Sequence, residues 1–110
     1  MSPSEQHKLV WFVPEEALDA TRDAVFEAGA GRIGEYERCS WYTKGEGTFL
    51  GGEGSDPTIG EPGREERLEE FRVETVVPVD SAREVVAALL AAHPYEEVAF
   101  ELYPLVQLEP

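Results

Sequence analysis

The sequence contains a single cysteine, Cys39, and no long apolar run. One cysteine excludes an internal disulfide and favours a reducing compartment. No stretch approaches the roughly 20 apolar residues that a membrane-spanning helix needs. The opening residues, MSPSEQHK, lack the apolar region of a secretory signal. These features predict a cytoplasmic protein without a membrane segment.

Basic residues are also scarce. Nine Lys and Arg residues face 23 Asp and Glu residues among 110, which gives a formal charge of −14. Binding to nucleic acids or to anionic membranes depends on clustered basic side chains, and the sequence has no such cluster. The charge therefore excludes these two classes of partner. The negative charge is compatible with cationic ligands, with basic partners or simply with solubility.

An apolar content of 42% is enough for one core, and the pattern predicts one domain over residues 7–106 with tails at 1–6 and 107–110. A continuous apolar run at 9–13 is typical of a strand covered on both faces. Apolar and polar residues alternate strictly at 68–78, which is typical of a half-buried strand. Ser81 and Glu84 have the spacing of a capping box that begins the second helix. The expected order is strand 9–13, helix 15–28, strand 33–43, strand 68–78, helix 82–93 and strand 98–103.

This βαββαβ order predicts an α+β, ferredoxin-like sandwich, in which a four-stranded antiparallel sheet carries both helices on one face. Trp11 and Phe12 have opposite parity in the first strand, so one of them faces the side without helices. Another copy of the same chain is the simplest cover for an apolar side chain there. We therefore expect a homo-oligomer.

Residues 44–63 contain seven of the ten glycines and read as a long glycine-rich loop. So long a loop in a compact domain indicates either a function or an undetected hairpin, with 48–50 as a short extra strand. Its composition suits a mobile lid or an oligomer-contacting arm better than a phosphate site, because its acidic residues would repel phosphate. The candidate ligand-binding residues of the chain are Gly45, Gly47, Thr48, Arg72 and Tyr95.

The segment His-Pro-Tyr-Glu-Glu at 93–97 is the sharpest candidate for a metal site. Imidazole and carboxylates suit a divalent transition metal, so the candidate ligands are His93, Glu96 and Glu97, with Cys39 as a softer donor. The dipole at the end of a helix would favour a charged His93. His93 also falls on the apolar stripe of the second helix, where it would serve the structure alone.

Arg72 lies between Glu70 and Glu74 on one face of the strand at 68–78, with Glu35 and Glu37 expected on the neighbouring strand. A cross-strand ladder of ion pairs is one interpretation of this pattern. The other is a charged wall around a subunit junction, where acidic residues from two chains hold Arg72.

Several motifs in order resemble a known family. They are GAGRIGEYERCSW at 29–41, GEGTF at 45–49, PTIGEPG at 57–63, EFRVE at 70–74 and HPYEE at 93–97. From about Leu9 to Leu105 the chain resembles the domain inserted in the middle of the Ngg-one-interacting factor three family of dinuclear-metal proteins. That domain is similar to PII signalling proteins and to the divalent-cation tolerance protein CutA.

The resemblance implies a free-standing PII/CutA-like domain that forms trimers, and it implies no reaction. The family's metal ligands lie in the regions that flank the insert, so none of them is carried onto these residues. The function expected is a non-enzymatic, homo-oligomeric regulatory module that binds a small ligand or a divalent cation. The alternatives are a metal-dependent hydrolase or cyclohydrolase activity, for which two histidines are few, and an oligomerisation scaffold for a protein partner.

Overall fold

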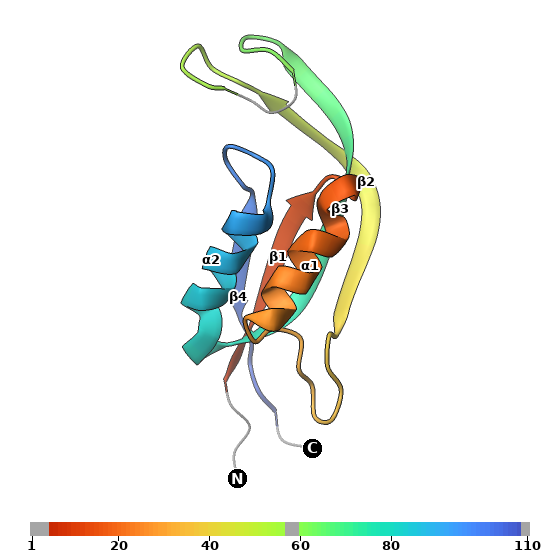
Figure 1. Cartoon of the computed structure of the whole chain (residues 1–110), viewed down its shortest axis with the longest axis vertical. Helices are drawn as coiled ribbons and strands as arrows, with labels where there is room; N and C mark the ends of the chain where they lie inside the picture. Colours follow the sequence, from red (N-terminus) through yellow and green to blue (C-terminus); the bar gives the residue numbers. More distant parts are fainter. Residues whose placement is uncertain (1–4, 57–59, 109–110) are drawn as a thin grey trace.

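A computed structural model describes residues 5–56 and 60–108, and parts of the expected tails and loop (1–4, 57–59 and 109–110) lie outside it (Figure 1). Two 3-10 turns, Glu15–Ala17 and Val79–Ser81, precede the two helices. The helices are α1 (Leu18–Glu27) and α2 (Ala82–Ala92). The strands are β1 (Gln6–Val13), β2 (Ser40–Leu50), β3 (Glu65–Pro78) and β4 (Phe100–Pro104).

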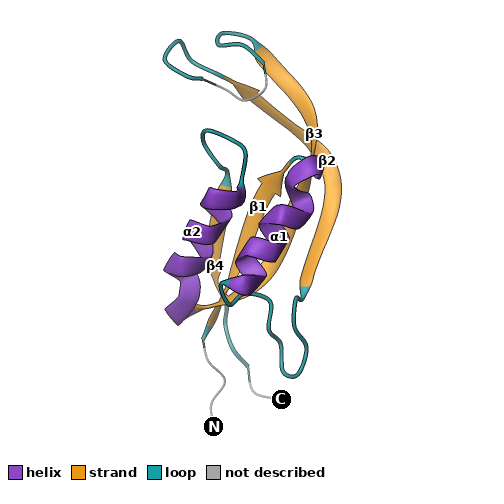
Figure 2. Cartoon of the chain, viewed as in Figure 1, coloured by secondary structure: helices purple, strands orange, loops and turns teal. Residues whose placement is uncertain are grey.

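The four strands form one sheet in the order β2-β3-β1-β4, and every neighbouring pair is antiparallel. Both helices lie on the same face of this sheet (Figure 2). The ferredoxin-like α+β sandwich expected from the order of elements is therefore confirmed. Within the described part of the chain, no helix has the length and apolar character needed to cross a bilayer.

The core lies between the helices and alternate residues of the central strands. Leu9, Trp11 and Val13 of β1 face the helices and are fully buried, with Val73 and Val77 of β3 beside them. The Trp11 indole donates a hydrogen bond of 3.1 Å to the Thr21 hydroxyl, which bonds the Ala17 carbonyl at 2.9 Å. This pairing allows one large aromatic side chain to be buried without losing its polar contact.

The opposite face of the sheet, here called the open face, is less apolar than expected. Val10 and Phe12 of β1 lie there, but Val10 is only 1% exposed and the Arg72 guanidinium lies 5.6 Å from the centre of the half-buried Phe12 ring. Arg72 also bonds Glu74 at 3.1 Å. The chain thus covers much of its own central strand, while Trp41 on β2 and Tyr103 on β4 are exposed aromatics of this face.

The second strand and the loop after it differ from the sequence expectation. Residues 33–36 form a tight turn, closed by two backbone hydrogen bonds between Ile33 and Tyr36, so β2 begins only at Ser40. β2 then continues to Leu50 in register with β3. The first seven residues of the expected loop 44–63 therefore belong to a long hairpin, whose strand character was hidden by Gly45 and Gly47. Glu35 and Glu37 lie outside β2.

The prediction of a capping box at the start of the second helix is wrong. The Ser81 side chain makes no capping hydrogen bond, because a 3-10 turn at Val79–Ser81 already leads the chain into α2. At the end of α1 the glycine signal is confirmed, since Gly29 and Gly31 have φ angles of 119° and 87°. A Cβ on Gly31 would also meet the Phe26 ring at 2.8 Å.

Candidate functional site

A cavity of about 400 Å³ lies between the far part of the β2–β3 hairpin and the loop that joins α2 to β4. In Figure 1 this part of the hairpin extends beyond the body of the domain and bends over that loop. The lining combines apolar side chains with hydroxyls and carboxylates. Its residues are Phe12, Thr48, Phe49, Leu50, Gly51, Gly52, Ser55, Leu68, Glu70, Tyr95, Glu96, Glu97 and Ala99.

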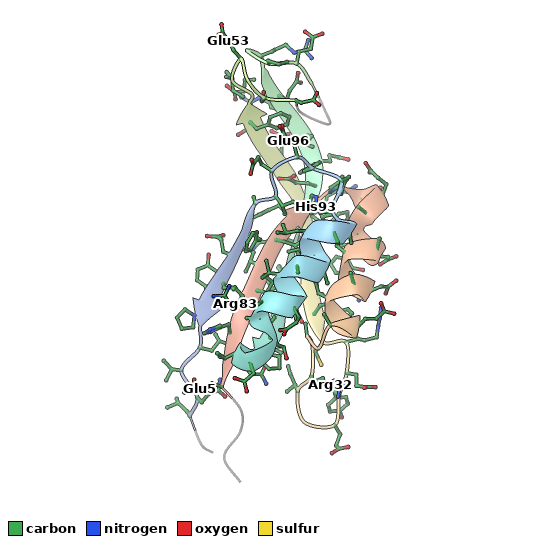
Figure 3. The ribbon with its side chains drawn as sticks, turned by 60° about the vertical axis from the view of Figure 1, so that its left-hand side comes forward. Glu5, Arg32, Glu53, Arg83, His93 and Glu96 are labelled. Carbon is green, nitrogen blue, oxygen red and sulfur yellow. The ribbon has the colours of Figure 1, made fainter. Side chains whose placement is uncertain are left out.

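One hydrogen bond joins the two walls of the cavity. The backbone N–H of Asp56, in the segment that joins β2 to β3, donates to Oε2 of Glu96 at 3.0 Å. Figure 3 shows Glu96 in the α2–β4 loop, with Glu53 at the far tip of the hairpin. Because residues 56 and 96 are far apart in sequence, this contact reports how closely the hairpin approaches the loop.

His93 holds the α2–β4 loop to the sheet. Its Nε2 lies 2.7 Å from the Phe12 carbonyl oxygen, and its Nδ1 accepts the backbone N–H of Tyr95 at 3.2 Å. An N–H can only donate, so Nδ1 carries no proton and Nε2–H donates to Phe12. The imidazole is therefore neutral, with both nitrogens occupied.

Burial lowers the pKa of His93, and its hydrogen bond to the Phe12 carbonyl opposes that effect. The helix dipole led us to expect a charged imidazole, but His93 is only 7% exposed and burial disfavours its charged form. Its two hydrogen bonds connect Phe12 of β1 to Tyr95 of the α2–β4 loop.

Tyr95 and Glu70 face each other inside the cavity. The Tyr95 hydroxyl is buried and makes no well-formed hydrogen bond to the described residues. Burial first, and then the charges of Glu70 and Glu16, raise the pKa of Tyr95 to about 12. Burial also raises the pKa of Glu70, while its interaction with the Tyr95 hydroxyl lowers it. The Tyr95 hydroxyl and the Glu70 carboxylate therefore form one interacting polar pair at the cavity.

Of the five candidate ligand-binding residues, Thr48 and Tyr95 line the cavity. Gly47 is not part of the lining but lies next to Glu70, because a Cβ at this position would overlap the Glu70 carboxylate. Gly45 has open space around it. Arg72 lies outside the lining, where it stacks on Phe12 and bonds Glu74 within its own chain.

The candidate metal ligands are not brought together. Glu96 and Glu97 line the cavity, but both nitrogens of His93 are engaged. Cys39 precedes β2 at the other end of the sheet, where its backbone bonds Gly31 and Thr75. Across residues 5–56 and 60–108, no three His, Cys, Asp or Glu side chains gather around one point. The set therefore does not fit a metal ion.

Sequence reasoning missed Glu70, Phe49 and Leu68 as cavity residues. Alternation at 68–78 did place Glu70 and Leu68 on one strand face. Only the continued pairing of β2 with β3 brings Phe49 onto the same face, and only the bend of the hairpin carries all three toward Tyr95.

The sequence and the fold were compared with known proteins. No family model matches the chain. The protein called "GTP cyclohydrolase 1 type 2 homolog" of Mycobacterium tuberculosis is 54% identical over 99 residues, 90% of this chain and 26% of that protein. The protein of the same name from Bacillus subtilis is 44% identical over 100 residues. A Bacillus cereus protein related to NIF3 superposes with a TM-score of 0.84 and 42% identity, over 97% of this chain and 27% of that one.

The chain is a NIF3-related domain. It spans about a quarter of the length of the curated relatives that it matches. The fold is also that of CutA: the periplasmic divalent cation tolerance protein CutA of Archaeoglobus fulgidus superposes with a TM-score of 0.69 at 15% identity, over 94% of this chain and 87% of that protein. The family resemblance stated from the motifs is thus confirmed.

Proposed function

We propose that this NIF3-related domain is a non-catalytic module that binds a small molecule in the cavity between the hairpin and the α2–β4 loop. The observation that carries the proposal is the cavity itself, a space of about 400 Å³. Volumes in this range are typical of small-molecule sites, which combine apolar walls with a few polar groups. The buried Tyr95 hydroxyl and the half-buried Glu70 supply those groups.

A regulatory role follows from how the cavity is built. Its upper wall is a hairpin that touches the α2–β4 loop through the bond between Asp56 and Glu96. A ligand that binds between the two walls would change the position of the hairpin, which could pass the signal to a partner. The cyclohydrolase in the name of the curated relatives is less well supported here, because His93 uses both nitrogens in structural bonds and neither His7 nor His93 lines the cavity.

We further propose that the module works as a homo-oligomer, a trimer by its resemblance to the PII/CutA group, and in the cytoplasm. Two observations favour self-association through the open face. Trp41 is 59% exposed on β2 and Tyr103 is 41% exposed on β4. The unpaired Cys39 favours a reducing compartment.

The test is an NMR titration of the ¹⁵N-labelled domain with a mixed panel of neutral, cationic and anionic fragments, Mg²⁺ and GTP. Binding in the cavity is expected to shift the amide resonances of Phe49, Ser55 and Tyr95, and to leave those of Gly31 and Cys39 unchanged. A panel in which no compound moves the three cavity resonances would reject the proposal. Sedimentation velocity on the same samples measures the oligomeric state, and a monomer at high concentration would reject the self-association.

A further inference from the structure

We infer that the cavity takes a small organic cation, a protonated amine or guanidinium carried on an apolar body about the size of one ring. The inference rests on the proposed function and names the chemical class of its ligand. Three carboxylates, Glu70, Glu96 and Glu97, line the cavity. Among the described lining residues there is no lysine, arginine or histidine to balance them. The field inside the cavity therefore favours positive charge.

Glu70 is the carboxylate that most needs a counter-ion. Its neighbours on β3 have one: Glu69 lies 3.7 Å from Lys44, and Glu74 lies 3.1 Å from Arg72. Glu70 forms no ion pair with any residue in the described part of the chain, although it is half-buried. A partly desolvated carboxylate without a cation is costly, and a ligand cation at this point would remove that cost.

The Tyr95 hydroxyl supplies the second polar contact. It is buried beside Glu70 and interacts with the Glu70 carboxylate, and its oxygen can still accept a hydrogen bond. An ammonium group has three donors, so one can bond the Tyr95 oxygen and another the Glu70 carboxylate. A neutral hydroxyl on the ligand could replace the hydrogen bonds but would leave the charge of Glu70 uncompensated.

The remaining walls define the body of the ligand. Phe12, Phe49 and Leu68 present apolar surface next to Glu70. A flat or aliphatic group packed against them would lose water-exposed area, which stabilises the complex by about 25 cal/mol per Å² buried. A hydrated inorganic ion would gain nothing from these walls, and a phosphate would meet three carboxylates. An amine with an apolar body uses every part of the lining.

Three probes of nearly the same shape test the inference: phenethylamine (a cation), 2-phenylethanol (neutral) and phenylacetate (an anion). Each is titrated into the labelled domain, and the shifts of Phe49, Ser55 and Tyr95 report binding. We expect phenethylamine to bind about tenfold more tightly than 2-phenylethanol, as charge-assisted hydrogen bonds add this much, and phenylacetate not to bind. Mg²⁺ at the same concentration is expected not to compete.

Two variants locate the charge. Glu70→Gln keeps the shape and removes the charge, and should weaken phenethylamine binding about tenfold while changing 2-phenylethanol less than about twofold. Glu69→Gln is the matched control, because the side chain is one residue away, points to the other face of β3 and is exposed. It should bind both probes like the wild type.

The outcomes separate the two proposals. Equal or tighter binding of the neutral or anionic probe at the same resonances, or an unchanged affinity in Glu70→Gln, overturns the cation and leaves the small-molecule module standing. If no probe and no compound of the wider panel shifts these resonances, both proposals fail. Competition by Mg²⁺ would assign the carboxylates to a metal ion and also overturn the inference.

Discussion

The two ends of β3 show how differently one strand can be used. Near its C-terminal end, Val73 and Val77 are fully buried beneath the helices, and their register with β1 is part of the core. Near its N-terminal end, β3 pairs only with β2, and its side chains from Glu65 to Glu70 are exposed or half-buried. Apolar and polar residues alternate from Phe71 to Glu74, whereas Leu68 is the one apolar residue between Glu65 and Glu70. The covered half holds the fold together, and the uncovered half forms the wall of a cavity.

The largest effect should come from truncating matched leucines in the two regions. Leu89→Ala removes a fully buried side chain from the core and is expected to lower the free energy of unfolding by about 2–5 kcal/mol. Leu50→Ala removes a side chain that is 59% exposed at the end of β2, and should change the free energy of unfolding by about 0.5 kcal/mol or less. Urea unfolding measures both, and similar losses in the two variants would refute the contrast.

The next effect concerns the buried polar pair of the core. Thr21→Val removes the acceptor of the Trp11 indole N–H and should destabilise the domain by about 1–3 kcal/mol, because a buried donor is left without a partner. Thr43→Val, at an exposed site on β2, is the matched control and should be close to neutral. Equal midpoints in urea for the two variants would contradict this role of Thr21.

His93, which holds the α2–β4 loop to β1, should make the free energy of unfolding depend on acidic pH. Burial lowers its pKa below 6.5, so the unfolded chain takes up the proton first and the free energy of unfolding falls as the pH drops below about 6.5. A proton on Nδ1 would also remove the acceptor of the Tyr95 N–H. Urea midpoints between pH 7.5 and 5 should fall more steeply for the wild type than for His93→Gln. Parallel curves would show that His93 does not titrate differently in the two states.

Tyr95, in the α2–β4 loop, should make the stability of the domain depend on alkaline pH. The pKa of Tyr95 is raised to about 12 from the ordinary 10, so the unfolded chain loses this proton first and the protein loses stability between these two values. Tyr95→Phe is expected to remove that part of the loss. Unfolding followed by circular dichroism at several pH values measures it, and an unchanged slope in the variant would argue against a buried Tyr95 hydroxyl.

The smallest effect on stability should come from Gly47→Ala. The new Cβ would overlap the end of the Glu70 side chain, which can swing away at little cost, so the free energy of unfolding should change by less than about 1 kcal/mol. Displacement of Glu70 should nevertheless weaken phenethylamine binding. Gly45→Ala, which has open space around it, is the control and should keep the wild-type affinity. Equal affinities in the two variants would show that Gly47 does not position Glu70.

Local pattern was enough to predict most of the body of the domain. The alternation at 68–78 placed Val73 and Val77 on one face, and the helical spacing of Leu18, Thr21 and Val25 placed all three in the core. It failed where glycine occupied strand positions, because Gly45 and Gly47 have low strand propensity and were assigned to a loop. Pairing with a long partner strand overrides that propensity. The signal for it in the sequence was the possible short strand at 48–50, and these three residues do belong to β2.

The order of elements, the acidic charge and the family motifs were therefore determined by the sequence alone, since each depends on residue type and local spacing. The cavity was decided by tertiary structure. Glu70, Phe49 and Tyr95 come together only because the hairpin bends over the loop that His93 holds to Phe12. Sequence periodicity gives the face on which a side chain lies, but a meeting of three distant segments depends on sheet register and strand curvature, which are properties of the folded chain as a whole.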